Sequence, residues 1–276
     1  MMSRLGQRLT TALEQCLCIA ALTAIGLAPA RAADFAVAVS PPRFELEVKP
    51  GERLREVIEI TNAAAQSSVF TVRTADWSLA PDASVSFMDE LAPQSCRPWV
   101  AIERRELTVM PGRPYRFRFE VTPPADAPPV ECRFAIMIEG QDQTTTGAGL
   151  AIPFNARLGV IVYAAVGDVQ PQLSVVGSGV QTIDGQPTPV LQVRNTGKAH
   201  GRLGGFLSGT DASNTPLDFA PGTTPILPGE TRSVALVATR PGDPHTAVAV
   251  RFPVTIRGKL EWGKKQSQEV EQRFQP

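Results

Sequence analysis

The sequence predicts an all-β protein made of two immunoglobulin-like β-sandwich domains in tandem. Short runs of alternating apolar and polar residues recur through residues 35–165, and Pro- and Gly-rich turns separate them. No segment keeps a helical apolar period over three turns. A second, smaller set of such runs follows from residue 172, which predicts a second core.

The first 32 residues are expected to form a secretory signal peptide. Arg4 and Arg8 make a basic start, and the apolar segment 16–27 is too short to span a bilayer. Ala30-Arg31-Ala32 supplies a small-x-small cleavage site. An N-terminal membrane anchor is the alternative. The signal predicts an exported protein with no membrane span in its mature chain.

The charge balance argues against two classes of partner. The chain has 27 basic and 27 acidic residues. This balance gives no electrostatic case for binding nucleic acid or an anionic membrane surface. We therefore expect neither as a partner.

Two cysteines, Cys96 and Cys132, remain once the signal is removed. In an oxidising compartment a disulfide between them is the default expectation, because no CxxC motif points to redox chemistry. Closing a loop of this length would stabilise the fold by about 4 kcal/mol in the chain-entropy model.

The first domain is expected over residues 33–167. Turn signals such as Ser40-Pro41-Pro42 and Lys49-Pro50-Gly51-Glu52 divide it, because Pro presets φ and Gly accepts the left-handed conformation. The expected strands are residues 35–39, 43–48, 54–61, 69–77, 99–109, 115–121 and 131–139.

Residues 149–163 form the most regular strand pattern in the chain. Every even position is apolar, beginning with Leu150, Ile152 and Phe154. Pro153 cannot donate a ladder hydrogen bond, which predicts an edge strand. A long apolar edge invites pairing with another chain. We therefore interpret such pairing as the role of this strand.

The second domain is expected over residues 168–276. Asn62 ends a strand of the first domain, and Asn195 ends its expected counterpart in the second. Pro-Gly turns precede strands in both domains, at 50–51, 111–112 and 228–229. The expected strands are residues 173–176, 190–194, 205–208, 232–238, 247–256 and 259–262, with 266–276 as a last strand and a frayed end.

The residues give no case for an enzyme. The two histidines, His200 and His245, lie in Gly- and Pro-rich turns and are expected to be exposed. No further residue has the spacing of a metal ligand, and no nucleophile elbow, P-loop or dinucleotide fingerprint is present. We expect no catalytic residues, no metal and no cofactor. The tryptophans are expected to anchor the cores, at Trp77, Trp99 and Trp262.

Two arginines inside apolar strands are candidate binding residues. Arg43 opens an early strand after Pro42, and Arg157 lies in the middle of the 149–163 strand. Each could be a solvated charge on an outer sheet face. Alternatively, both point into one cleft and bind a partner's terminal carboxylate through charge-assisted hydrogen bonds.

The order of these features resembles the periplasmic chaperones of the chaperone–usher pilus assembly pathway. The features are Pro42-Arg43 opening the first domain, a strand closing on Asn62, a strand running into Pro111-Gly112, a next-to-last strand at 132–139 and a long last strand at 150–163. The resemblance spans both domains. It implies that the last strand of the first domain completes an unfinished pilin subunit by β-strand donation.

The resemblance also assigns roles to single residues. The donated face would consist of Leu150, Ile152 and Phe154. Arg43 matches the cleft arginine of the family. The cleft lysine of the family falls on Gly159, and Arg157, two residues earlier on the same strand face, could take its place.

The sequence thus predicts a periplasmic chaperone that binds and stabilises a secreted pilin-like subunit, with an outer-membrane usher as the further partner that the family implies. The alternative is a two-domain structural or adhesive Ig-like protein of the envelope. Burial separates the two, because a chaperone would expose Leu150 and Ile152 and a structural protein would pack them.

Overall fold

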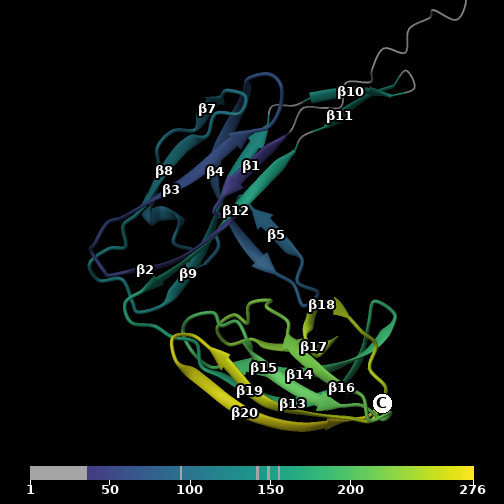
Figure 1. Cartoon of the computed structure of the whole chain (residues 1–276). Coiled ribbons are helices and arrows are strands. Elements are labelled where there is room, and N and C mark those ends of the chain that lie inside the picture. Colours follow the sequence, from purple (N-terminus) through teal and green to yellow (C-terminus); the bar gives the residue numbers. More distant parts are fainter. Residues whose placement is uncertain (1–35, 94, 141–142, 148–149, 155) are drawn as a thin grey trace, which may run out of the picture. The chain divides into compact units, whose positions relative to one another are not determined.

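The structure is a computed structural model that describes residues 36–276 except 94, 141–142, 148–149 and 155, and for residues 143–154 it describes the backbone alone. The predicted signal peptide therefore lies outside the described residues. The chain is all-β, and two immunoglobulin-like sandwiches follow each other along it (Figure 1). Both sandwiches belong to one compact unit, Ala36–Gln141 with Asn155–Pro276, and Asp142–Phe154 belongs to another.

The first sandwich packs two sheets against each other. One sheet has the strand order β1-β3-β8-β6, and the other has the order β2-β12-β9-β4-β5, with β7 also paired to β4. The bounds are β1 Val37–Ser40, β2 Arg43–Val48, β3 Leu54–Asn62, β4 Ser68–Leu79, β5 Val85–Met88, the 3-10 turn η1 Arg97–Trp99, β6 Val100–Ile102, β7 Glu106–Val109, β8 Tyr115–Val121, β9 Glu131–Gly140 and β12 Arg157–Val166.

Alternation along each strand builds the core of this sandwich. In β2, Phe44, Leu46 and Val48 are buried, and the residues between them are exposed. Phe119 of β8 packs edge-on against Phe44, with ring centroids 5.2 Å apart, and against Phe134 of β9 at 6.3 Å. The two sheets therefore share one aromatic core.

The chain changes sheets between its first two strands. β1 pairs antiparallel with β3, whereas β2 pairs in parallel with β12, where Arg43 lies opposite Ile161. Pro41 and Pro42 stand between β1 and β2 and have no N–H to donate, so the first ladder ends there. The crossing places β2 beside the second half of β12.

The prediction of one edge strand over 149–163 is wrong in two respects. β11 (Leu150–Phe154) pairs with β10 (Gln143–Gly147) in a two-stranded hairpin, and β12 is a separate strand. In addition, β12 lies between β9 and β2 in its sheet, and β2 pairs with Ile161–Val166, so this half of β12 is not an edge. Apolar alternation shows which face of a strand is buried, but it does not show which strands are neighbours.

The second sandwich follows one sheet path, in the order β13-β14-β17-β16-β15-β19-β20, with β18 also paired to β17. The two ends of this path meet, because the Val175 N–H of β13 donates to Gln268 Oε1 of β20 (3.2 Å). The path thus encloses its own core. The bounds are β13 Leu173–Ile183, β14 Gln186–Asn195, β15 Gly204–Thr210, β16 Pro216–Pro221, β17 Thr231–Arg240, β18 Asp243–Ala247, β19 Val254–Trp262 and β20 Gln266–Phe274.

Two strand predictions in this domain fail at prolines. The predicted strand 247–256 is wrong, since β19 begins only at Val254, directly after Pro253. β16 was not predicted, because the prolines at both of its ends are typical of turns. The prediction of a last strand in the tail is confirmed by β20, whose residues alternate between half-buried and exposed.

A buried asparagine ends the corresponding strand in each sandwich, as predicted. Asn62 ends β3 and Asn195 ends β14, and both are fully buried. Each side-chain amide donates to two carbonyls, one in the loop that follows it and one just before a Pro-Gly turn. The acceptors are Gln66 and Val109 for Asn62, and Ala199 and Ile226 for Asn195, at 2.7 to 3.1 Å.

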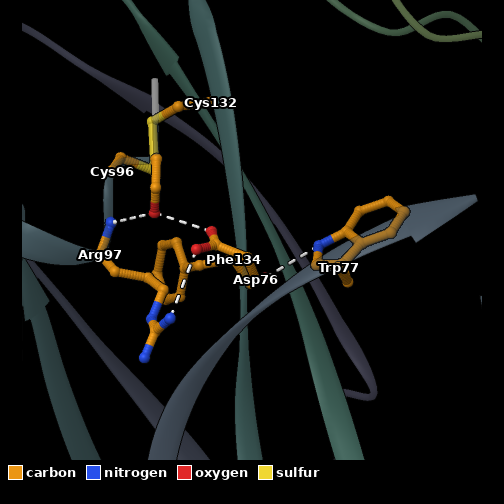
Figure 2. The surroundings of a disulfide bond; sticks show 7 residues. Asp76, Trp77, Cys96, Arg97, Cys132 and Phe134 are labelled. Carbon is orange, nitrogen blue, oxygen red and sulfur yellow. Dashed lines mark hydrogen bonds and ion pairs between the residues drawn. A yellow bond between two sulfur atoms is a disulfide. The ribbon is translucent and has the colours of Figure 1, made fainter. Parts of the chain in front are cut away.

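The predicted disulfide between Cys96 and Cys132 is confirmed (Figure 2). It joins the residue before η1 to β9, with the two Cα atoms 5.8 Å apart. Beside it, the buried carboxylate of Asp76 accepts a hydrogen bond from Ser95 Oγ (2.7 Å) and pairs with Arg97 Nη1 (3.3 Å). The cross-link and this ion pair therefore hold the same loop against the sheet.

Replacing Asn62 by alanine should lower the free energy of unfolding by about 2 to 3 kcal/mol, because buried carbonyls lose their donor. Urea unfolding followed by circular dichroism would measure the change. The matched control is Gln66→Ala, which removes an exposed side chain but keeps the carbonyl that accepts from Asn62. Equal stability of the two variants would show that the amide is not needed to close the sandwich.

Replacing both Cys96 and Cys132 by alanine should lower the free energy of unfolding by about 4 kcal/mol, because the unfolded chain regains the freedom of a large loop. The same urea titration would measure it. Dithiothreitol should destabilise the wild type by a similar amount and leave the double variant unchanged. A double variant as stable as the oxidised wild type would contradict this expectation.

Candidate functional site

Arg43, predicted from the sequence to be a binding residue, lies on the outer face of the β2–β12 strand pair. On β2, Arg43, Glu45 and Glu47 alternate with the core residues. On β12, Ile161 lies opposite Arg43 and Tyr163 lies opposite Glu45. Parallel pairing therefore places the beginning and the end of the first sandwich side by side on this face.

Arg43 and Arg157 lie on the same face of this sheet but at different points along it. Arg157 is four residues before Ile161, the partner of Arg43, so the two backbone positions are about 13 Å apart. Both side chains reach solvent. Arg43 Nε pairs with Glu45 Oε1 at 2.9 Å. Joint binding of a carboxylate by the two arginines stays a prediction.

Gly159, the position that matches the family's lysine, is covered by Phe87 of β5. A Cβ atom at Gly159 would lie 2.7 Å from Cε1 of the Phe87 ring and 3.2 Å from Met137 Sδ. A side chain at this position would have to displace the end of the Phe87 ring. A second cationic group on this face must therefore come from another position.

The prediction that His200 is exposed is wrong. Its side chain is only 8% exposed, and its ring stacks on that of Tyr163 with centroids 3.8 Å apart. Nδ1 lies 2.7 Å from Glu131 Oε2, and Nε2 lies 3.5 Å from Glu45 Oε1. The loop that carries His200 packs against the first sandwich, which local composition could not reveal. His245 is exposed, as predicted.

Arg202, in the same loop as His200, adds a second guanidinium beside Glu45. Its Nη1 donates to the Thr223 carbonyl (2.7 Å), and its Nη2 donates to Tyr163 Oη (3.4 Å). Its Nε is buried, lies 3.5 Å from Glu45 Oε1, and has no hydrogen-bond partner within the described part of the chain. Arg202 is thus held in place while one donor remains unused.

An open cavity of about 340 Å³ lies among these groups. Its polar lining includes Glu45, His200, Arg202 and Lys264. Lys264 Nζ pairs with Glu47 Oε1 at 2.7 Å. The lining also includes the carboxylates of Glu47 and Glu131, so both acidic and basic side chains border the cavity.

The surrounding charges fix the protonation state of Glu45. His200 is the largest cause that lowers the pKa of Glu45; burial opposes it, and the charges of Arg43 and Arg202 lower the pKa further, to about 2. Burial acts to lower the pKa of His200, but hydrogen bonds to Glu131 and Glu45 outweigh burial and raise it. Glu45 is therefore ionised at neutral pH.

The tryptophans lie at different depths. Trp77 is 5% exposed and packs edge-on against Tyr163, with centroids 5.5 Å apart, on the outer face of the sheet rather than between the sheets. Trp99 and Trp262 are partly buried at the margins of the cores. Trp77 thus supports the ring on which His200 stacks.

The predicted donated face lies in β11, outside the sheets of both sandwiches. The register places Ile152 opposite Thr145 of β10. The side chains of Leu150, Ile152 and Phe154 lie outside what the structure describes, and their exposure stays a prediction.

Two further findings concern the described residues as a whole. In that part of the chain, no three or more His, Cys, Asp or Glu side chains are grouped so that they could hold a metal ion. It also contains no helix of the length and apolarity that a membrane crossing requires.

No protein-family model and no curated protein matches the chain. Solved structures do match. The chain is similar to chaperones of fimbria assembly. A chain of a chaperone–tip adhesin complex of CFA/I fimbriae biogenesis has a TM-score of 0.48 and 12% identity, over 87% of this chain and 99% of that one. A chain of the Salmonella enterica SafA pilin–SafB chaperone complex has a TM-score of 0.46 and 12% identity, over 87% of this chain and 98% of that one. The E. coli chaperone DraB has a TM-score of 0.45 and 13% identity, over 86% of this chain and 99% of that one.

Replacing His200 by glutamine should destabilise the protein most at low pH. Because the pKa of His200 is raised on folding, its contribution is fully present below the pKa of an unfolded histidine and is lost as pH rises through the folded pKa. Glu131, Glu45, Tyr163 and Arg202 are the ionisable groups that face the ring. Urea unfolding from pH 6 to pH 9 should show the difference from wild type shrinking. The matched control is His245→Gln, and a pH-independent difference for His200→Gln would contradict the expectation.

Proposed function

We propose that the mature chain is a periplasmic chaperone that binds a secreted pilin-like subunit by β-strand donation and holds it for assembly at the outer membrane. The supporting observation is β11, which has apolar residues at alternate positions and, among the described strands, pairs with β10 alone. A two-stranded hairpin is only marginally stable and keeps an unpaired edge. An added client strand would satisfy that edge.

The donated face is proposed to consist of Leu150, Ile152 and Phe154. Main-chain hydrogen bonds to β11 would supply affinity without depending on the client's sequence. The alternate apolar side chains would set the register, because a slip by one residue turns the whole row to the opposite face.

Arg43 and Arg157 are proposed to anchor the C-terminal carboxylate of the subunit. The two share the outer face of the sheet, and both side chains reach solvent. Guanidinium groups bind carboxylates through paired, charge-assisted hydrogen bonds. This role requires no cofactor and no catalytic residue, and we propose no enzymatic activity.

The extent of the mature chain follows from the same proposal. Cleavage after Ala32 would release the protein into the periplasm, with an immunoglobulin-like chaperone domain over 33–167 and a second domain over 168–276. An outer-membrane usher would be the second partner, receiving the loaded subunit.

The proposal is tested by capture from periplasm with Ile152→Glu and Ala151→Glu variants. A small secreted partner should co-purify with the wild type and with Ala151→Glu, and be lost with Ile152→Glu. The two changes introduce the same charge into one strand at adjacent positions, which point to opposite faces. Mass spectrometry would identify the partner.

Hydrogen exchange provides the decisive control on the captured complex. The amides of β11 should exchange at least about tenfold more slowly with the partner bound, because strand pairing protects them. If exchange is unchanged, or if both variants capture the partner equally, strand donation fails. The structural or adhesive envelope protein would then be the better account.

A further inference from the structure

Two guanidinium groups and one imidazole ring converge on a single oxygen atom, Glu45 Oε1. Arg43 Nε lies 2.9 Å from this atom. Arg202 Nε and His200 Nε2 each lie 3.5 Å from it. Arg43 belongs to the first sandwich, and the other two belong to a loop of the second. A carboxylate is the acceptor that suits such a set of donors, because each of its oxygens can accept more than one hydrogen bond.

One of these donors remains unused. Arg202 directs its two terminal nitrogens to the Thr223 carbonyl and to Tyr163 Oη. Its buried Nε has no hydrogen-bond partner in the described part of the chain. A buried N–H without an acceptor is costly, and Glu45 at 3.5 Å balances its charge without bonding it. A carboxylate that moved closer would satisfy it.

Glu45 is as exposed as Arg43 and more exposed than His200 and Arg202. Its side chain is 49% exposed, whereas that of Arg202 is 22% exposed. His200 is held by Glu131 and by stacking on Tyr163. Glu45 also borders the open cavity. Its carboxylate can therefore turn into solvent while His200 and Arg202 keep their positions.

We propose that Arg43, His200 and Arg202 form a carboxylate-binding site that Glu45 occupies in the free protein, and that the carboxylate of a ligand binds there by displacing Glu45. The ligand is the C-terminal carboxylate of the subunit, and in this choice of ligand the inference rests on the proposed function. It deepens that function in two ways. Arg202 supplies a further guanidinium to the anchor, beside Arg43. Glu45 keeps the anchor filled until a competing carboxylate arrives.

The test uses N-acetylalanine as a small free carboxylate and its neutral amide as the matched probe. Isotope-edited NMR of the mature chain follows the arginine Nε–H and histidine ring signals during titration. Glu45→Gln should bind N-acetylalanine about tenfold more tightly than the wild type, because the competing charge is gone. The amide should bind neither protein.

Two variants control this experiment. Glu47→Gln removes the same charge two residues further along the same face of β2, and it should leave the wild-type affinity unchanged. Adding Arg202→Lys to Glu45→Gln keeps the positive charge but removes the Nε–H, and it should cancel the gain. Equal gains from Glu45→Gln and Glu47→Gln, or a gain that survives Arg202→Lys, would overturn the proposal.

The result separates this inference from the proposed function. Suppose that Glu45→Gln does not bind N-acetylalanine more tightly, while Ile152→Glu still abolishes subunit capture. Strand donation then stands and the proposed Glu45 site is refuted. If the gain is found but no subunit is captured, the carboxylate site stands and the chaperone role falls.

Discussion

The parallel hydrogen-bond ladder between β2 and β12 is the interaction on which the candidate site depends. It forms because the chain leaves one sheet at the end of β1 and joins the other at Arg43. The ladder aligns Arg43 with Ile161 and Glu45 with Tyr163. Without it, the acidic and basic residues of β2 would have no neighbouring strand, and the second sandwich would lose the surface on which His200 stacks.

Residues of both sandwiches make up the candidate site. Phe87 fills the space above Gly159, so β12 presents no long side chain at that position. The loop of the second sandwich provides His200 and Arg202 instead. Buried ionic groups are tolerated only when they are paired, and the contact of His200 with Glu131, whose side chain is 4% exposed, meets that condition.

The sequence predicted those features of the molecule that are local. Alternation found most strands of the first domain, and the paired asparagines and the two cysteines were placed correctly. It failed where the outcome depends on contacts distant in sequence. Glu45 was within reach of local reasoning, since it shares a strand face with Arg43. His200 and Arg202 were not, because their partners lie in another domain and a Gly-rich loop gives no sign of what it packs on.

The matched asparagines also bear on the order in which the chain folds during synthesis. Every acceptor of Asn62 lies before the second Pro-Gly turn, and every acceptor of Asn195 lies before the third. Each polar network is therefore complete within its own domain. Since domains generally fold as units, N-terminal first, while the chain grows, the first sandwich can satisfy its buried amide before the second has been made. A vectorially emerging chain thus never has to hold Asn62 unpaired while it waits for its C-terminal half.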